Sequence, residues 1–174
     1  DESFGSSGRA LSAAAFSTIV ESTNGVPVVA ERTSWWPDAI WYEAHSSAGV
    51  AATASRWAIA DAAAGIPGSA TLPEHLQTYV LILNTSPHQG AVRIRLFLDD
   101  GLVLEGWSYL SGHDRVSVGL GDAQLRLARG HRFWALVESA SDTPLQLVVE
   151  RSTYWSVGGV LWAAGTSTPA TALP

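Results

Sequence analysis

Two groups of aromatic residues have the clearest chemical use in this sequence. The first is Trp35, Trp36, Trp41 and Tyr42, and the second is Tyr154, Trp155 and Trp162. Exposed Trp and Tyr rings stack on the C–H faces of sugars, so a row of such rings suits a carbohydrate-binding surface. The alternatives are that the rings close the ends of a β-sandwich, or that they form a patch where neighbouring units dock.

Neighbouring residues of a strand point to opposite faces, so at most one of Trp35 and Trp36 belongs to a core. We take Trp36 and its counterpart Trp155 as structural residues. The candidate surface for a ligand or for self-association then consists of the remaining rings: Trp35, Trp41, Tyr42, Tyr154 and Trp162.

Two acid–base pairs, Glu31-Arg32 and Glu150-Arg151, are the next candidates. Adjacent strand residues face opposite ways, so neither pair is an ion pair within itself. We expect Glu31 to meet an arginine across the sheet, and Arg32 and Arg151 to be half-buried with carboxylate partners. A glycosidase needs two carboxylates about 5–9 Å apart in a cleft. No such pair stands out among the glutamates of the expected strands: Glu21, Glu31, Glu138 and Glu150.

Other catalytic and metal-binding patterns are weak. The 5 histidines are scattered, with none at metal-ligand spacing. Ser111-Gly-His-Asp114 brings three catalytic residue types together, but a triad is defined by geometry, and no Gly-x-Ser-x-Gly turn occurs. We therefore predict no enzyme, no catalytic residue and no cofactor. A calcium ion in the aspartate-containing turns (Asp99, Asp100, Asp114 and Asp122) stays an open alternative.

Composition narrows the class of protein. The chain has 174 residues, of which 47% are hydrophobic and 15% charged, as in a globular domain. A net charge of −6 disfavours binding to nucleic acid or to anionic lipid. No apolar run approaches the roughly 18 residues of a membrane helix, so we expect no membrane insertion. The sequence starts without Met or an apolar leader, so a secretion signal, if one existed, has been removed.

Sulfur is absent altogether, because the chain has neither Cys nor Met. It therefore has no disulfides and no thiolate metal sites. Resistance to common oxidants suits a place outside the cell. All 10 basic residues are arginine and none is lysine. A GC-rich genome, which replaces Lys with Arg, is therefore an alternative explanation of the unusual composition.

Short runs with a period of two dominate the sequence and predict about ten strands. The expected strands are 15–22, 26–36, 40–44, 78–83, 91–98, 102–110, 115–120, 133–139, 145–155 and 160–164. Asn24-Gly25 and Asp99-Asp100-Gly101 predict tight turns, because Gly accepts a positive φ. Residues 55–64 have helical composition, and we expect a short helix or a loop with one helical turn there. Many short strands without long helices predict an antiparallel β-sandwich of immunoglobulin-like character.

One stretch of the sequence occurs twice. Phe16–Ser22 recurs as Phe133–Ser139, and the later part, through Trp36, recurs through Trp155 after an insertion of two residues. An insertion of two keeps every later side chain on its face of a strand, so the duplicated stretch is predicted to be a strand pair. We expect residues 1–9 to be a linker and residues 10–174 to form one sandwich, built from a half repeat (10–57) and a full unit (58–174). The two copies would occupy matching places in one interior, unless the half repeat completes a neighbouring chain.

The sequence also resembles a known repeat. The segment Glu21–Arg32 with Val-Pro-Val-Val-Ala-Glu-Arg is the most specific part, and Trp41-Tyr-Glu-Ala-His45, Thr78–Asn84 and the tail Thr168–Pro174 extend the likeness over most of the chain. It is similar to repeats of about 120 residues at the C-terminal ends of large secreted bacterial surface proteins. The second copy departs from the pattern at Ser141-Asp142 and at Ala163-Ala164-Gly165. The resemblance implies an immunoglobulin-like sandwich outside the cell, without assigned chemistry.

Together these observations predict a non-catalytic structural or adhesive module of a secreted surface protein, able to self-assemble through strands or an aromatic patch. Its partners would be copies of itself, neighbouring repeat units or a cell-surface polysaccharide. The alternative is a carbohydrate-binding module that uses the Trp and Tyr platform.

Overall fold

The computed structural model describes residues 15–36, 43–65, 76–120, 125–158 and 160–174. Its strands are β1 (Glu31–Trp36), β2 (Glu43–Ala48), β3 (Arg56–Ala64), β4 (Leu76–Asn84), β5 (Gly90–Leu98), β6 (Val103–Leu110), β7 (Arg115–Gly119), β8 (His131–Ser139), β9 (Leu147–Val157), β10 (Val160–Pro169) and β11 (Thr171–Leu173). A short 3-10 helix, Arg126–Ala128, precedes β8. No helix among the described residues is long and apolar enough to cross a membrane.

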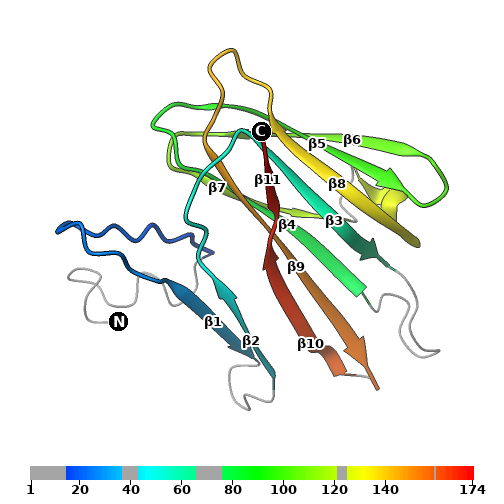
Figure 1. Ribbon diagram of the computed structural model, residues 1–174. Coiled ribbons are helices and arrows are strands. Elements are labelled where there is room, and N and C mark those ends of the chain that lie inside the picture. The colour runs from blue at the N-terminus through cyan, green and yellow to red at the C-terminus, as the bar shows by residue number, and fades with distance from the viewer. Residues whose placement is uncertain (1–14, 37–42, 66–75, 121–124, 159) are drawn as a thin grey trace.

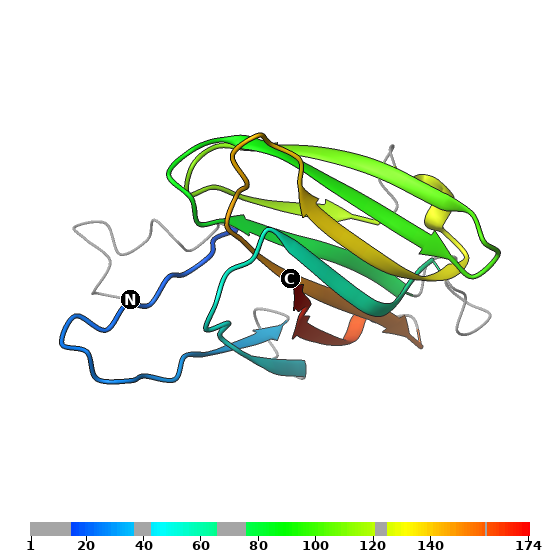
Figure 2. The ribbon, with the colours of Figure 1, turned by 45° about the horizontal axis from the view of Figure 1, so that its top comes forward.

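Two antiparallel sheets form the body of the protein (Figure 1). One has five strands in the order β11-β3-β8-β5-β6, and the other has four in the order β10-β9-β4-β7. Figure 2 shows the two sheets as layers, one above the other. The predicted antiparallel β-sandwich is therefore confirmed.

The interior follows from alternation along the strands. In β5, Val92, Ile94, Leu96 and Leu98 are buried while Arg93 and Arg95 face outward, in keeping with the alternation of apolar and arginine residues along this strand. The opposite layer contributes residues such as Val80, Ile82, Leu147 and Val149, each at most 1% exposed. Burying apolar side chains between the layers drives the fold, since each contributes about 1.5–3 kcal/mol.

The prediction for residues 55–64 was wrong. This segment forms β3, paired with β8 on one side and β11 on the other. Trp57 and Ile59, two residues apart, both enter the core at 2% and 4% exposure, as alternation along a strand leads one to expect. Alanine favours helix in isolation, but the hydrogen bonds and burial offered between two strands override that preference.

The first copy of the duplicated stretch does not lie in the core. Residues 15–30 form no strand, although 15–22 and 26–36 were predicted to be strands; of the second, only the part that forms β1 is a strand. Phe16, Ile19 and Val20 are 52–57% exposed, whereas their counterparts Phe133, Leu136 and Val137 are at most 7% exposed. The copies therefore do not share one interior, because the places beside β3, β5 and β4 are filled by β8 and β9.

The two copies have one structural feature in common: each ends in a strand that forms a hairpin with the strand that follows it. β1, the end of the first copy, pairs with β2, and β9, the end of the second, pairs with β10. By contrast β8 and β9 belong to different sheets, so the duplicated strands themselves are not a hairpin. The β1–β2 hairpin is a separate two-stranded sheet alongside β10, at the layer that contains β9 (Figures 1 and 2). The predicted linker at 1–9 lies outside the described residues.

Candidate functional site

Three surface features gather chemically useful side chains. The first is a cluster of rings between the β1–β2 hairpin and the four-stranded sheet. It comprises Trp36, His45, Tyr79, Tyr154 and Trp162, and we call it the hairpin cluster. The Trp36 ring lies edge-on to His45 and to Tyr154, with centroids 5.3 and 5.5 Å apart, and Tyr154 and Trp162 are 5.1 Å apart.

Hydrogen bonds and one ion pair fix the hairpin cluster. The Trp36 indole Nε1 donates to the Trp162 carbonyl at 2.6 Å, and the Trp162 Nε1 donates to Gln77 Oε1 at 2.6 Å. An ion pair of 3.0 Å joins Arg32 of the first copy to Glu150 of the second. The expected carboxylate partner of Arg32 thus comes from the other copy, and the hairpin is tied to the sandwich by polar and aromatic contacts together.

The backbone of β10 is shaped to this contact. Trp162 has a φ of 52°, a left-handed conformation that is uncommon for a bulky residue. Its amide donates to Ser156 Oγ at 3.1 Å, which helps to hold it there. A Cβ added to Gly165 would lie 2.7 Å from the Tyr154 ring and 3.0 Å from the Trp36 ring, so only glycine lets the hairpin approach this closely.

Burial shifts the pKa values of two residues in the hairpin cluster, His45 and Tyr154. Burial first, and then the charge of Arg32, lower the pKa of His45 below its ordinary 6.5, although Glu150 opposes the shift. Burial also raises the pKa of Tyr154. Both groups are therefore held in their neutral forms, as packing residues require.

Beside this cluster is an open pocket of about 270 Å³. Its lining residues are Tyr79, Leu81, Ser117, Ser152, Tyr154 and Trp162. The lining offers rings and hydroxyl groups but neither a carboxylate nor an imidazole, so it can hold a small ring without supplying an acid–base pair.

The structure divides the predicted surface residues. It brings Tyr154 and Trp162 together with Trp36 in the hairpin cluster. It places Trp35 on β1, 53% exposed. Trp41 and Tyr42 lie outside the described residues.

The remaining structural pairs have different surroundings. Glu31 is exposed at the start of β1, and Trp155 is partly buried on β9 opposite Leu76 of β4. Arg151 donates a hydrogen bond to the carbonyl of Asp61 on β3, so it reaches from one layer to the other. Arg151 thus meets a backbone carbonyl where a carboxylate was expected.

The second feature was not predicted from the sequence. It lies on the outer side of the five-stranded sheet, and we call it the aromatic–arginine face. Its residues are Arg56, Arg93, Arg95, Phe97, Glu105, Trp107, Tyr109, Trp134 and Glu138. Trp107, Tyr109 and Trp134 are 44–65% exposed. The Trp134 ring stacks on Phe97 with centroids 3.7 Å apart and planes 2° apart.

Glu138 is the centre of this face. Arg95, Arg93 and Arg56 approach its carboxylate at 2.6, 3.2 and 3.2 Å. Burial alone would raise the pKa of Glu138, but the hydrogen bonds and charges of Arg95 and Arg93 outweigh it and lower that pKa. Three guanidinium groups share one carboxylate, and the buried Nε atoms of Arg93 and Arg95 have no hydrogen-bond partner.

A sequence signal for this face did exist. Glu105, Trp107 and Tyr109 alternate along one expected strand, and Arg93 and Arg95 alternate with apolar residues along another. What the sequence lacked was the order of the strands, which places β6, β5, β8 and β3 side by side. Among the four strand glutamates, nothing distinguished Glu138 without that order.

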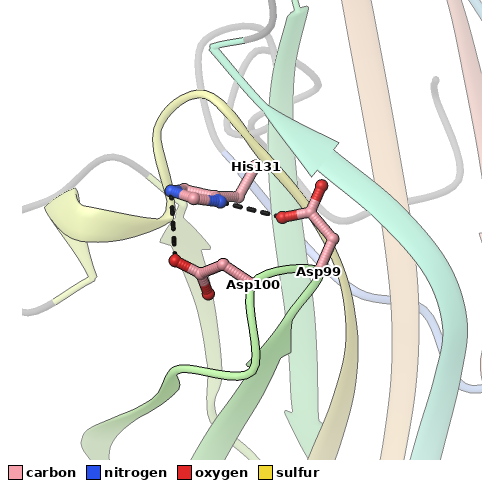
Figure 3. A group of neighbouring side chains, drawn as sticks. All are labelled: Asp99, Asp100 and His131. Carbon is pink, nitrogen blue, oxygen red and sulfur yellow. Dashed lines mark hydrogen bonds and ion pairs between the residues drawn. The ribbon is translucent and has the colours of Figure 1, made fainter.

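The third feature is a small cluster of Asp99, Asp100 and His131, whose ligand atoms all lie within 4.8 Å of one another (Figure 3). Asp99 Oδ1 is 2.8 Å from His131 Nδ1, and this hydrogen bond lowers the pKa of Asp99. Asp100 Oδ2 is 3.9 Å from His131 Nε2. With Nδ1 occupied, the imidazole can offer only Nε2 to a cation. The cluster links the β5–β6 turn, where Gly101 has a φ of 90°, to the start of β8.

The Ser111–Asp114 segment forms a turn between β6 and β7 and assembles no triad. The Ser111 carbonyl accepts from Asn84 Nδ2, the His113 amide donates to the Ser86 carbonyl, and the Asp114 carboxylate accepts from the Arg115 amide. Asp114 lies in a different turn from Asp99, and Asp122 lies outside the described residues.

These features lie on an all-β sandwich. The hairpin cluster is at its four-stranded sheet, and the aromatic–arginine face is on its five-stranded sheet. Neither the known family models nor the curated protein sequences give a match to this chain. The fold is similar to the crystal structure of Thermotoga maritima 1070, with a TM-score of 0.55 and 14% identity over 69% of this chain and 95% of that one. A weaker likeness, with a TM-score of 0.42 and 24% identity over 55% of this chain and 93% of that one, is to the Anabaena sensory rhodopsin transducer. The first similarity supports the fold alone.

Proposed function

We propose that this chain is a non-catalytic module of an extracellular bacterial surface protein, with a structural or adhesive role. The observation that carries the proposal is the aromatic–arginine face. Trp, Tyr and Arg contribute most of the energy at protein contacts, and here they are exposed together on one sheet. The lack of Cys and Met supports an extracellular place.

The electrostatics of the face argue for binding rather than hydrolysis. A general acid needs a raised pKa, whereas the pKa of Glu138 is lowered and its oxygens are engaged by three arginines. The partner would be another copy, a neighbouring unit or a cell-surface polymer.

Sedimentation velocity across a dilution series tests self-association through the face. We expect association in the native chain and its loss in a Trp107→Ser, Tyr109→Ser double variant. A Trp35→Ser variant, on the distant hairpin, is the matched control. A native chain that is monomeric and also fails to bind whole cells would reject the adhesive role.

The second candidate is a carbohydrate-binding module. It is favoured by the spacing of Trp107 and Tyr109, which project from the same side of the edge strand β6, beside Arg93 of β5. Pull-down on insoluble polysaccharides and calorimetry with soluble oligosaccharides test it. Binding that persists after both rings are removed would exclude this face as the sugar site.

A further inference from the structure

The N-terminal segment of the described chain carries an unusual amount of exposed apolar surface. Six large side chains between residues 16 and 29 are 52–94% exposed: Phe16, Ile19, Val20, Val26, Val28 and Val29. The segment forms no strand up to Ala30. Exposed apolar runs of this kind mark a surface made for a partner.

The sequence of the segment indicates what the partner is. Phe16-Ser-Thr-Ile-Val-Glu-Ser22 matches Phe133-Trp-Ala-Leu-Val-Glu-Ser139, which is β8. In the sandwich β8 lies between β3 and β5, where Phe133 and Val137 are 4% and 0% exposed. Phe16 and Val20 are the same residue types at the same spacing, so they suit the same surroundings.

We propose that residues 16–36 are the β8 and β9 strands of a second sandwich, received by a repeat unit that has the sequence of residues 54–132. The proposal rests on the proposed function only in treating the chain as one module of an array. The receiving unit would supply strands like β3, β4, β5, β6 and β7. It would also bring arginines equivalent to Arg56, Arg93 and Arg95 to the carboxylate of Glu21, which corresponds to Glu138.

This chain's own sandwich cannot receive the segment. β3 and β5 each already pair with β8, and β4 pairs with β9 and β7. A second intact copy has the same places filled. The occupant is therefore a unit whose β8 and β9 places are vacant.

In the structure, the C-terminal part of the segment, residues 31–36, forms β1 of the docked hairpin, and insertion into a second sandwich would replace this position. Arg32 and Trp36 correspond to Arg151 and Trp155. Arg151 reaches across the sandwich to Asp61 of β3, whereas Arg32 now pairs with Glu150 on the four-stranded sheet. Insertion into a second sandwich exchanges the contacts with Glu150 and Trp162 for contacts across the new interior.

The test is a chain extended at its N-terminus, in which residues 54–132 are joined directly to Phe16, as they are to Phe133. The readout is amide hydrogen exchange measured by mass spectrometry. In the native chain we expect residues 16–22 to exchange fast. In the extended chain we expect exchange to be at least about 100-fold slower, approaching that of residues 133–139.

Two variants of the extended chain make the test specific. Val20→Asp, at the counterpart of the fully buried Val137, should restore fast exchange. Ser17→Asp, at the counterpart of the 44% exposed Trp134, should leave the protection intact. Both positions are exposed in the native chain, so neither substitution should alter its stability.

Fast exchange at residues 16–22 in the extended chain overturns the proposal. A second extended chain, with residues 133–155 in place of 16–36, guards against a trivial failure of the added unit. If only the second extended chain gains protection, residues 16–36 are not equivalent to β8 and β9. If neither gains it, strands β3–β7 do not form a receiving half. Neither result bears on the aromatic–arginine face, so the proposed function is judged separately.

Discussion

At the scale of single residues, Glu138 shows how one side chain organises a surface. Its carboxylate gathers arginines from β3 and β5, the two neighbours of β8. Without it, three guanidinium groups would face one another on a partly buried sheet surface. The negative charge is therefore a structural requirement for an otherwise cationic face.

We expect Glu138→Gln to lower the free energy of unfolding by about 1–3 kcal/mol, since it removes charge-assisted hydrogen bonds to arginine. Urea unfolding at neutral pH measures this. Glu105→Gln on the same face is the control, because the amide can still accept from the Trp107 indole and the site is exposed. The lowered pKa of Glu138 means that its contribution is complete above its ordinary value of 4.5 and is lost as the pH falls through the folded-state pKa. Equal stability of both variants would contradict the expectation.

His45 gives a second expectation for pH. Its pKa is lowered in the folded protein, so the folded state binds the proton less tightly than the unfolded state. Docking of the β1–β2 hairpin should be complete above pH 6.5 and should weaken as the pH falls below that value. Tryptophan fluorescence between pH 7.5 and 5 measures this, since Trp36 and Trp162 are two of the 8 tryptophans that contribute to the signal. A His45→Phe variant, which cannot titrate, should remove the pH dependence, and an unchanged dependence in that variant would refute the assignment.

At the scale of elements, the sequence predicted strands wherever burial and alternation agree. β5 alternates between apolar and arginine residues, so its faces could be assigned before any pairing was known. β3 could not be assigned, because an alanine-rich run forms a strand only when β8 and β11 supply its hydrogen bonds. The strand predicted at residues 16–22 was wrong for the opposite reason. The residues have a strand-like pattern, but no strand of the described chain pairs with them.

The candidate site was predictable only in part for the same reason. The sequence indicated that the aromatic rings matter, and it identified Tyr154 and Trp162, but it could not tell which rings the hairpin would cover. Trp107 and Tyr109 became interesting only when β6 proved to be an edge strand next to the arginines of β5. Strand order is a long-range property that local periodicity does not encode.

Gly165 tests how closely the hairpin must approach β10. Gly165→Ala places a methyl group 2.7 Å from the Tyr154 ring, which the packed cluster cannot accommodate without moving. We expect a loss of about 1–3 kcal/mol in unfolding free energy, as for other overpacked sites, together with faster hydrogen exchange in β1 and β2. Thr168→Ala, at an exposed position of the same strand, is the control. An alanine variant as stable as this control would show that the hairpin can move away from β10 without loss of stability.

At the scale of the whole molecule, stability and surface contacts are assigned to different parts of the chain. Every buried hydrophobic residue of the described core lies between Trp57 and Val149. The β1–β2 hairpin packs on the outer side of the four-stranded sheet, and neither it nor residues 15–30 contribute to that interior. The chain thus combines a sandwich that holds the buried core with an N-terminal segment, residues 16–29, whose apolar side chains are exposed.

This division predicts the outcome of shortening the chain. A chain of residues 49–174 keeps all the core residues, so we expect cooperative urea unfolding with a nearly unchanged m-value, because m follows the surface exposed on unfolding. The unfolding free energy should fall by only about 2 kcal/mol, from the lost contacts of Arg32 and Trp36. A chain ending at Gln146 loses Leu147 and Val149, both fully buried, and should not unfold cooperatively. If the 49–174 chain also loses its cooperative transition, the hairpin is part of the folding unit, and the core does not by itself determine the fold.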